Sequence, residues 1–125
     1  MSMYKDSSVN FTVSGNPIPK QSFRKGKHNY TPKRITAWQD TVGWKAKEAM
    51  IGRDIFEGDL KVQIYFRRKD KRRADLDNLC KAILDACNGI VWEDDNQIIE
   101  LHLYKLIDKE DPGVGIRVDY FGGST

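Results

Sequence analysis

The feature that most limits how this chain can fold is a change in hydrophobic spacing between residues 60 and 103. Residues 60–66 alternate apolar and polar side chains, and residues 99–103 do so again, which predicts two half-buried strands. Residues 75–88 carry apolar side chains at helical spacing, and Asn88-Gly89 suits the end of a helix because both residues tolerate positive φ. A strand, a helix and a strand in this order predict a sheet with a helix packed against it.

The flanking sequence supplies the other expected elements. Residues 9–14 alternate and predict a first strand, whereas residues 20–33 are basic, lack an apolar face and predict a long functional loop. Thr31-Pro32 predicts the start of a helix that continues through Met50, and residues 114–120 predict a last strand. The predicted fold class is therefore α+β in the order β-α-β-α-β-β, with a four-stranded mixed sheet and two helices packed on one face.

Length and composition agree with one small globular domain. The chain has 125 residues, of which 39% are hydrophobic, so one core is feasible and two would each be marginal. We expect a single domain over residues 9–121, with flexible termini at 1–8 and 122–125. No apolar stretch is long enough to span a membrane and no signal peptide is visible, so we predict a cytoplasmic protein without a membrane partner.

The two cysteines predict no disulfide. Cys80 and Cys87 fall on one predicted helix, roughly 10 Å apart along its axis. A disulfide needs Cα atoms within about 7 Å, so we interpret both as small buried apolar residues.

The distribution of charge says more than the net charge of +3. Basic residues concentrate at 20–34 and 67–73, whereas acidic residues collect at 75–85 and 93–95. This segregation predicts a polyanionic partner, held by cationic segments around a carboxylate-rich centre.

Three aspartates define that centre. Asp75 and Asp77 flank Leu76 where a basic run meets a helix start, and the turn after the helix could bring Asp95 beside them. Three carboxylates would repel unless a cation sat among them, and oxygen ligands suit Mg²⁺ or Mn²⁺. The alternative interpretation, that Asp75 caps the helix and Asp77 is a first-turn acid, is equally simple on spacing alone.

Two neighbours of the aspartates have alternative roles as well. Lys81 lies four residues after Asp77 and could stabilise charge at a phosphate, or form an ordinary surface pair with Asp77 or Asp85. Trp92 is expected to pack beneath the acidic turn and hold Asp95 in position. Asp85 and Asp94 are the acids most easily mistaken for ligands.

The basic residues predict contacts with DNA phosphates. Such contacts give affinity and fix the position of the protein on the DNA, but they do not read the base sequence. A plain solvated loop is the alternative for the first basic run. The predicted DNA-binding residues are Lys20, Arg24, Lys25, Lys27, Arg68, Lys69, Arg72 and Arg73.

The pattern Asp75-Leu-Asp77-Asn78-Leu-x-Lys81, followed by Asp94-Asp95-x-Gln97-Ile98, resembles the RusA family of Holliday junction resolvases. The resemblance implies a homodimeric, Mg²⁺-dependent endonuclease that makes paired nicks in a four-way DNA junction, with Mn²⁺ able to replace Mg²⁺. It makes Asp75, Asp77 and Asp95 the metal ligands, Lys81 a catalytic residue and Asn78 a supporting one. Ala74 departs from the family, whose members often carry a basic residue there, and Arg72 or Arg73 would have to compensate.

Two other functions remain open on the sequence. The chain could be a branched-DNA binding module that does not cleave, although the intact set of acids and lysine argues against this. It could also be a nuclease that acts on flaps or RNA.

Overall fold

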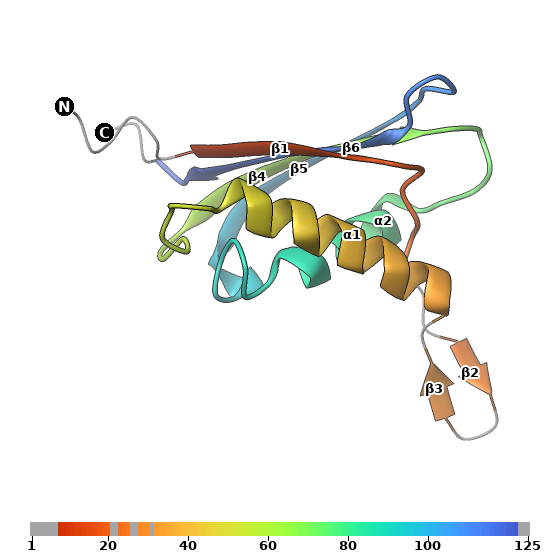
Figure 1. Cartoon of the computed structure of the whole chain (residues 1–125), viewed down its shortest axis with the longest axis horizontal. Helices are drawn as coiled ribbons and strands as arrows, with labels where there is room; N and C mark the ends of the chain where they lie inside the picture. The colour runs from red at the N-terminus through yellow and green to blue at the C-terminus, as the bar shows by residue number, and fades with distance from the viewer. Residues whose placement is uncertain (1–7, 21–22, 26–27, 31, 123–125) are drawn as a thin grey trace.

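The computed structural model describes residues 8–20, 23–25, 28–30 and 32–122. Four strands form the main sheet: β1 (Ser8–Ser14), β4 (Leu60–Arg68), β5 (Ile98–Ile107) and β6 (Gly113–Tyr120). Two helices, α1 (Lys33–Ala49) and α2 (Leu76–Cys87), lie on the same face of this sheet (Figure 1). A small hairpin, β2 (Phe23–Lys25) and β3 (His28–Tyr30), and a 3₁₀ turn, η1 (Asp95–Gln97), complete the chain.

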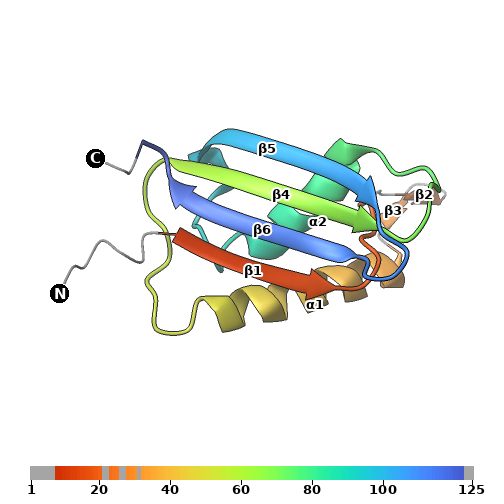
Figure 2. The ribbon, with the colours of Figure 1, turned by 90° about the horizontal axis from the view of Figure 1, so that it is seen from above.

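The sheet has the order β1-β6-β4-β5, so that β1 and β5 form its two edges (Figure 2). β6 is antiparallel to both of its neighbours, and β5 is parallel to β4. A parallel pair needs a crossover connection, and α2 provides it by running back from the end of β4 toward the start of β5. The predicted α+β class, the mixed sheet and the two helices on one face are confirmed.

The alternation in β4 builds the core as expected. Leu60, Val62, Ile64 and Phe66 are fully buried beneath the helices, and the residues between them face the open side of the sheet. Val114, Ile116 and Val118 of β6 bury their side chains in the same layer. Both helices turn an apolar stripe to this layer, which explains why both lie on one side of the sheet.

Three expectations about the first part of the chain need correction. Part of the loop expected at 20–33 forms the β2–β3 hairpin, which projects from the sheet beside the start of α1 (Figure 1). Ser8, expected in a flexible terminus, pairs with Asp119 in β1. Pro32 rather than Thr31 is the N-cap residue of α1 and offers no side-chain cap; Thr31, the rest of the expected leader (1–7) and residues 123–125 lie outside the described residues.

The edge strand β5 is less buried than its alternation predicts. Ile99 is 52% exposed and Leu101 39% exposed, and β5 is an edge strand with a neighbouring strand on one side only. This leaves the helix-side face of an edge strand accessible, and two pockets open there.

Candidate active site at the start of helix α2

The first pair of acids lies where the backbone changes from extended to helical. Asp75 is the N-cap residue of α2, with extended φ and ψ of −76° and 139°, and its side chain makes no capping hydrogen bond. Asp77 lies in the first turn of the helix. Side chains two apart share a side only while the backbone stays extended, so the two carboxylates leave the chain in different directions.

Asp95 is held firmly by the turn that follows α2. The indole N–H of Trp92 donates to Asp95 Oδ1 at 2.7 Å, and Trp92 itself is fully buried. Gln97 fixes the other end of the turn, because its side-chain amide donates to the carbonyls of Phe56 and Gly58. The supporting role predicted for Trp92 therefore takes the form of a direct hydrogen bond to the carboxylate.

Asp77, Lys81 and Asp95 line one pocket of about 340 Å³ between α2 and β5, which we call the carboxylate pocket. Its floor includes Cys80 and its far wall is formed by Leu101 and Leu103. The pKa of Cys80 is raised to about 11, mainly by burial and then by the negative charges of Asp95 and Asp77. Asp77 and Asp95, which lie in separate segments of the chain, therefore both lie close enough to Cys80 to raise its pKa.

Asp75 faces a different pocket. This second pocket, of about 260 Å³, is lined by Arg68, Asp70, Lys71, Arg72, Arg73, Ala74, Asp75, Lys105 and Ile107, and we call it the cationic pocket. Asp75 Oδ1 lies 3.4 Å from Arg73 Nε, in a pair whose side chains are 49% and 89% exposed. Within the described part of the chain, no three His, Cys, Asp or Glu side chains come close enough to hold a metal ion together, so the expected meeting of all three aspartates is not seen.

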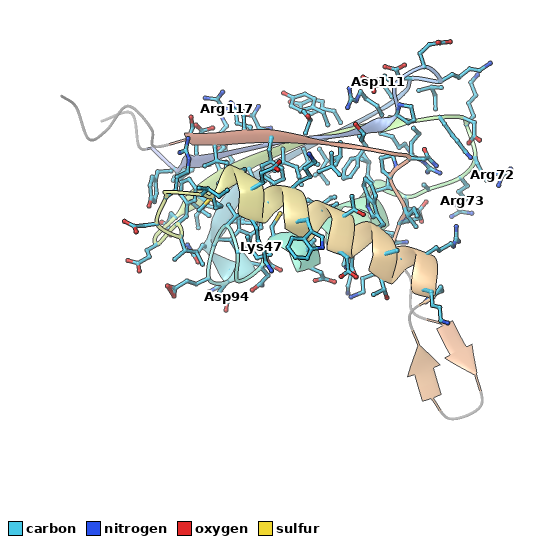
Figure 3. All side chains as sticks on the ribbon, in the orientation of Figure 1. Lys47, Arg72, Arg73, Asp94, Asp111 and Arg117 are labelled. Atoms are coloured by element: carbon cyan, nitrogen blue, oxygen red, sulfur yellow. The ribbon has the colours of Figure 1, made fainter. Side chains whose placement is uncertain are left out.

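The acids interpreted as unlikely ligands have other partners. Asp94 caps η1, accepting from the Asn96 N–H at 2.8 Å, while the Gln97 side chain accepts from the Asp94 N–H at 2.9 Å. Asp85 Oδ2 lies 2.6 Å from Lys20 Nζ, although its side chain also reaches the carboxylate pocket. Figure 3 shows Asp94 at the opposite end of the view from Arg72 and Arg73.

Asn78, the predicted supporting residue, connects α2 to the segment after β1. Its backbone carbonyl accepts from the Lys20 N–H at 2.9 Å, and its own N–H donates to Asp77 Oδ1 at 2.9 Å. The second contact helps to set the direction of the Asp77 carboxylate.

The predicted DNA-binding residues divide into three groups. Lys69, Arg72 and Arg73 are exposed on the loop between β4 and α2, as a phosphate contact requires. Lys20 is paired with Asp85, Arg24 and Lys25 lie in β2, and Lys27 lies outside the described residues. Arg68 is buried rather than exposed, with an exposed fraction of only 5% and its Nε 3.4 Å from Asn16 Oδ1, and its contact with DNA stays a prediction.

Alternation explains the burial of Arg68. It follows Phe66 by two residues in β4, so its side chain leaves the strand on the helix-covered face rather than toward solvent. The count of basic residues in the run 67–73 did not reveal this, although the strand period, extended by one step, would have done so.

Lys105 is a site residue that sequence reasoning missed. It lies in β5, and its Nζ donates to the backbone carbonyl of Ala74 at 2.7 Å, thirty-one positions earlier in the chain. Its pairing with Phe66 in the register of β4 and β5 brings it to the cationic pocket, and no local motif carries that information.

Comparison with known proteins identifies the family of the chain. The sequence signature described as Endodeoxyribonuclease RusA matches residues 12–119. The chain belongs to the RusA family. A crossover junction endodeoxyribonuclease RusA of Aquifex aeolicus is 30% identical over 118 residues, covering 90% of this chain and 92% of that protein. Those of Escherichia coli K12 and of Enterobacteria phage 82 are each 33% identical over 96 residues, covering 72% of this chain and 78% of each relative.

Membership of the RusA family makes the chain an endodeoxyribonuclease, which is a hydrolase of DNA phosphodiesters. The matched range contains both pockets and all three motif aspartates. Among the helices of the described residues, none is both long enough and apolar enough to cross a bilayer.

Proposed function

We propose that this RusA-family chain resolves four-way DNA junctions by Mg²⁺-dependent paired nicking, as a homodimer. The observation that carries the proposal is the carboxylate pocket, where Asp77 and Asp95 from separate segments meet beside Lys81. The relatives are crossover junction endodeoxyribonucleases, and their substrate supplies the substrate class.

The donor set of the carboxylate pocket fits Mg²⁺. Mg²⁺ prefers oxygen ligands and is usually bound through one or two carboxylates together with water and substrate phosphate. Asp77 is exposed and Asp95 half-buried, so both would remain reachable by water and by a phosphodiester. When bound, Mg²⁺ would act as a Lewis acid on a phosphate oxygen and polarise water for attack.

The chain's own residues would position the metal ligand Asp95 and stabilise negative charge on the substrate. Trp92 donates to Oδ1 of Asp95, and the other carboxylate oxygen, Oδ2, would be available as a metal ligand. Lys81 places an ammonium group in the same pocket, where it would stabilise negative charge on the phosphate or the leaving oxygen. The products expected from the family resemblance are 5′-phosphate and 3′-hydroxyl ends.

Asp75 is proposed as the third metal ligand and would have to leave Arg73 to serve as one. The two side chains form an exposed pair at 3.4 Å, and exposed pairs contribute only about 0–1 kcal/mol. Binding of a divalent cation or DNA could therefore redirect Asp75 at little cost. Its lack of a capping hydrogen bond means that α2 would lose no cap in the process.

DNA would be held by basic residues on the loop beside the two pockets and on the β2–β3 hairpin. Lys69, Arg72 and Arg73 lie on the loop that leads into α2, and the β2–β3 hairpin carries Arg24 and Lys25 outward from the sheet. Contacts of this kind recognise the shape and charge of a junction rather than a base sequence.

A second copy of the chain is proposed to pack against β5. This strand is an edge of the sheet, and Tyr104 and Leu106 are exposed on its open side, away from the two pockets. Covering an apolar edge strand removes both its unpaired backbone and its exposed side chains from water. A symmetric dimer would also present two active sites to a junction that has two-fold symmetry.

A junction-cleavage assay tests the proposal. A synthetic four-way junction, labelled in each strand, is incubated with the full chain in Mg²⁺, Mn²⁺, Ca²⁺ or a chelator. We expect symmetric nicks in Mg²⁺ and Mn²⁺, and binding without product in Ca²⁺ or chelator. Binding without cleavage in every metal would identify a binding module, and faster cleavage of flaps or RNA would assign a different substrate.

A further inference from the structure

The cationic pocket has an excess of positive charge that the carboxylate chemistry does not use. Five cationic side chains line it, against two carboxylates. Both carboxylates already have partners: Asp70 Oδ1 accepts from the Arg72 N–H at 2.9 Å, and Asp75 Oδ1 lies 3.4 Å from Arg73 Nε. The pocket is therefore suited to an anion from outside the chain.

The position of the pocket in the fold is also one that favours an anion. It opens where the carboxyl ends of the parallel strands β4 and β5 meet the first residues of α2. Ligands of sheets with parallel strands bind outside the carboxyl ends of those strands, and the N-terminus of a helix carries partial positive charge. Two features besides the helix end, Lys105 and Arg68, point to a specific ligand.

Lys105 is the first of these features. Its side chain crosses from β5 to the loop, and one of its three N–H donors is used by the Ala74 carbonyl at 2.7 Å. No carboxylate partner for its ammonium group is found among the described side chains. The hydrogen bond to Ala74 thus holds a positive charge beside Asp75 and leaves two donors for a ligand.

Arg68 is the second feature. Its guanidinium is buried, its Nε reaches Asn16, and its Nη1 has no hydrogen-bond partner within the part of the chain that the structure describes. Burial lowers the pKa of Arg68, with Asp70 opposing this effect and Arg72 adding to it, yet an arginine remains protonated. A buried guanidinium with an unpaired Nη1 adds positive potential to the pocket that it lines, and Asp70 offsets only part of it.

We propose that the cationic pocket binds a phosphodiester of the DNA strand that is cut, next to the one that enters the carboxylate pocket, and that Lys105 donates directly to it. The inference rests on the proposed function, since it assigns a second phosphate of the same substrate. The methyl side chain of Ala74 cannot bind a phosphate. Lys105, which reaches the Ala74 carbonyl from β5, supplies positive charge at this point of the loop. Lys105 would be a substrate-binding residue that also positions the Asp75 loop.

The test measures the salt dependence of junction binding in a chelator, where no cleavage occurs. The variants are Lys105→Gln, which keeps an N–H donor for the Ala74 carbonyl but loses the charge, and Lys105→Arg, which keeps the charge. Lys61→Met is the matched control, because Lys61 lies in β4 on the open side of the sheet. Each lost phosphate contact lowers the slope of log affinity against log salt by about 0.9.

We expect Lys105→Gln to lose about one contact, while Lys105→Arg and Lys61→Met keep the wild-type slope. The ratio of wild-type to Lys105→Gln affinity should then be about 3.5-fold larger at 50 mM than at 200 mM salt. A folded Lys105→Gln variant with the wild-type slope would overturn the proposal and leave Lys105 as a structural link to Ala74.

A second measurement needs no variant. A bound junction should protect Lys105 of the wild-type chain from acetylation, relative to Lys61, and equal acetylation with and without DNA would also overturn the proposal. The proposed function fails separately if the wild-type chain neither binds nor cleaves junctions. If it does both and the Lys105 results are negative, only the present inference is wrong.

Discussion

The two pockets beside α2 share a helix and an edge strand but have opposite charge. The carboxylate pocket contains Asp77 and Asp95, whereas the cationic pocket is dominated by arginine and lysine side chains. A nuclease needs both, because carboxylates that attract a metal ion also repel the phosphodiester that must approach it. A cationic pocket at the same end of α2 offsets that repulsion without neutralising the metal ligands.

The pockets also differ in rigidity. Asp95 is fixed by a buried indole and by a turn that is capped at both ends. The cationic pocket is built largely on the exposed loop between β4 and α2, with Lys105 as its link to the sheet. We therefore expect changes in the carboxylate pocket to act on the chemical step and changes in the cationic pocket to act on DNA binding.

The largest effect is expected for Asp95→Asn. The substitution keeps the shape of the side chain and an acceptor for Trp92 but removes the charge that would bind Mg²⁺. Loss of several kcal/mol of charge stabilisation predicts a cleavage rate lower by about 10³-fold, measured in single-turnover assays.

The neighbouring residue supplies the control for that experiment. Asp94→Asn should cleave at nearly the wild-type rate, because asparagine can also cap η1. Junction affinity of both variants in Ca²⁺ should be close to that of the wild type. Equal rates for the two variants would contradict the assignment of Asp95 as a metal ligand.

Lys81→Met should have the next largest effect. Removing one positive group from the position where charge develops predicts a cleavage rate lower by about 10²-fold, with little change in junction affinity. Lys45→Met is a suitable control, since Lys45 lies exposed on α1 in a 3.4 Å pair with Glu48. If affinity fell as much as the rate, Lys81 would belong to DNA binding instead.

Trp92→Phe tests how the turn positions Asp95. The variant loses the 2.7 Å hydrogen bond, and the loss of such a supporting contact predicts a 10- to 100-fold higher Mg²⁺ concentration for half-maximal cleavage. Because Trp92 is fully buried, thermal unfolding should be measured in parallel. A destabilised variant with an unchanged Mg²⁺ requirement would limit Trp92 to packing.

The smallest effect concerns the two buried thiols, Cys80 in the lining of the carboxylate pocket and Cys87 near it. Burial and the nearby acids raise the pKa of Cys80 to about 11, and burial and Asp95 raise that of Cys87 to about 12. At pH 8 without divalent metal, both thiols should react with iodoacetamide at least about tenfold more slowly than in the unfolded chain, where their pKa is about 8.5.

The sign of the pH dependence follows from the same shifts. Folding holds the thiols protonated, so this contribution to stability is complete below pH 8 and is lost as the pH rises toward 11. Cys80→Ala should reduce the loss of stability over this range in chelator, measured by denaturant unfolding. Rapid labelling of the folded chain at pH 8 would show that the pocket floor is open.

The elements of the sheet and both helices were predictable because each has a hydrophobic period that its own residues display. Alternation in β4 and helical spacing in α2 placed those elements to within a residue or two, and they needed no knowledge of their neighbours. The β2–β3 hairpin was missed because its strands are three residues long, too short for a period to show.

The candidate site divides in the same way. The chain order of Asp75, Asp77, Lys81 and Asp95 is a property of the sequence, as is the resemblance to the RusA family. The approach of Asp95 to Asp77, the separation of Asp75, the burial of Arg68 and the reach of Lys105 to Ala74 are all tertiary. They depend on the register of β4 with β5 and on the position of β5 at the edge of the sheet. Neither is a property of any one segment, because each arises only when the segments pack together.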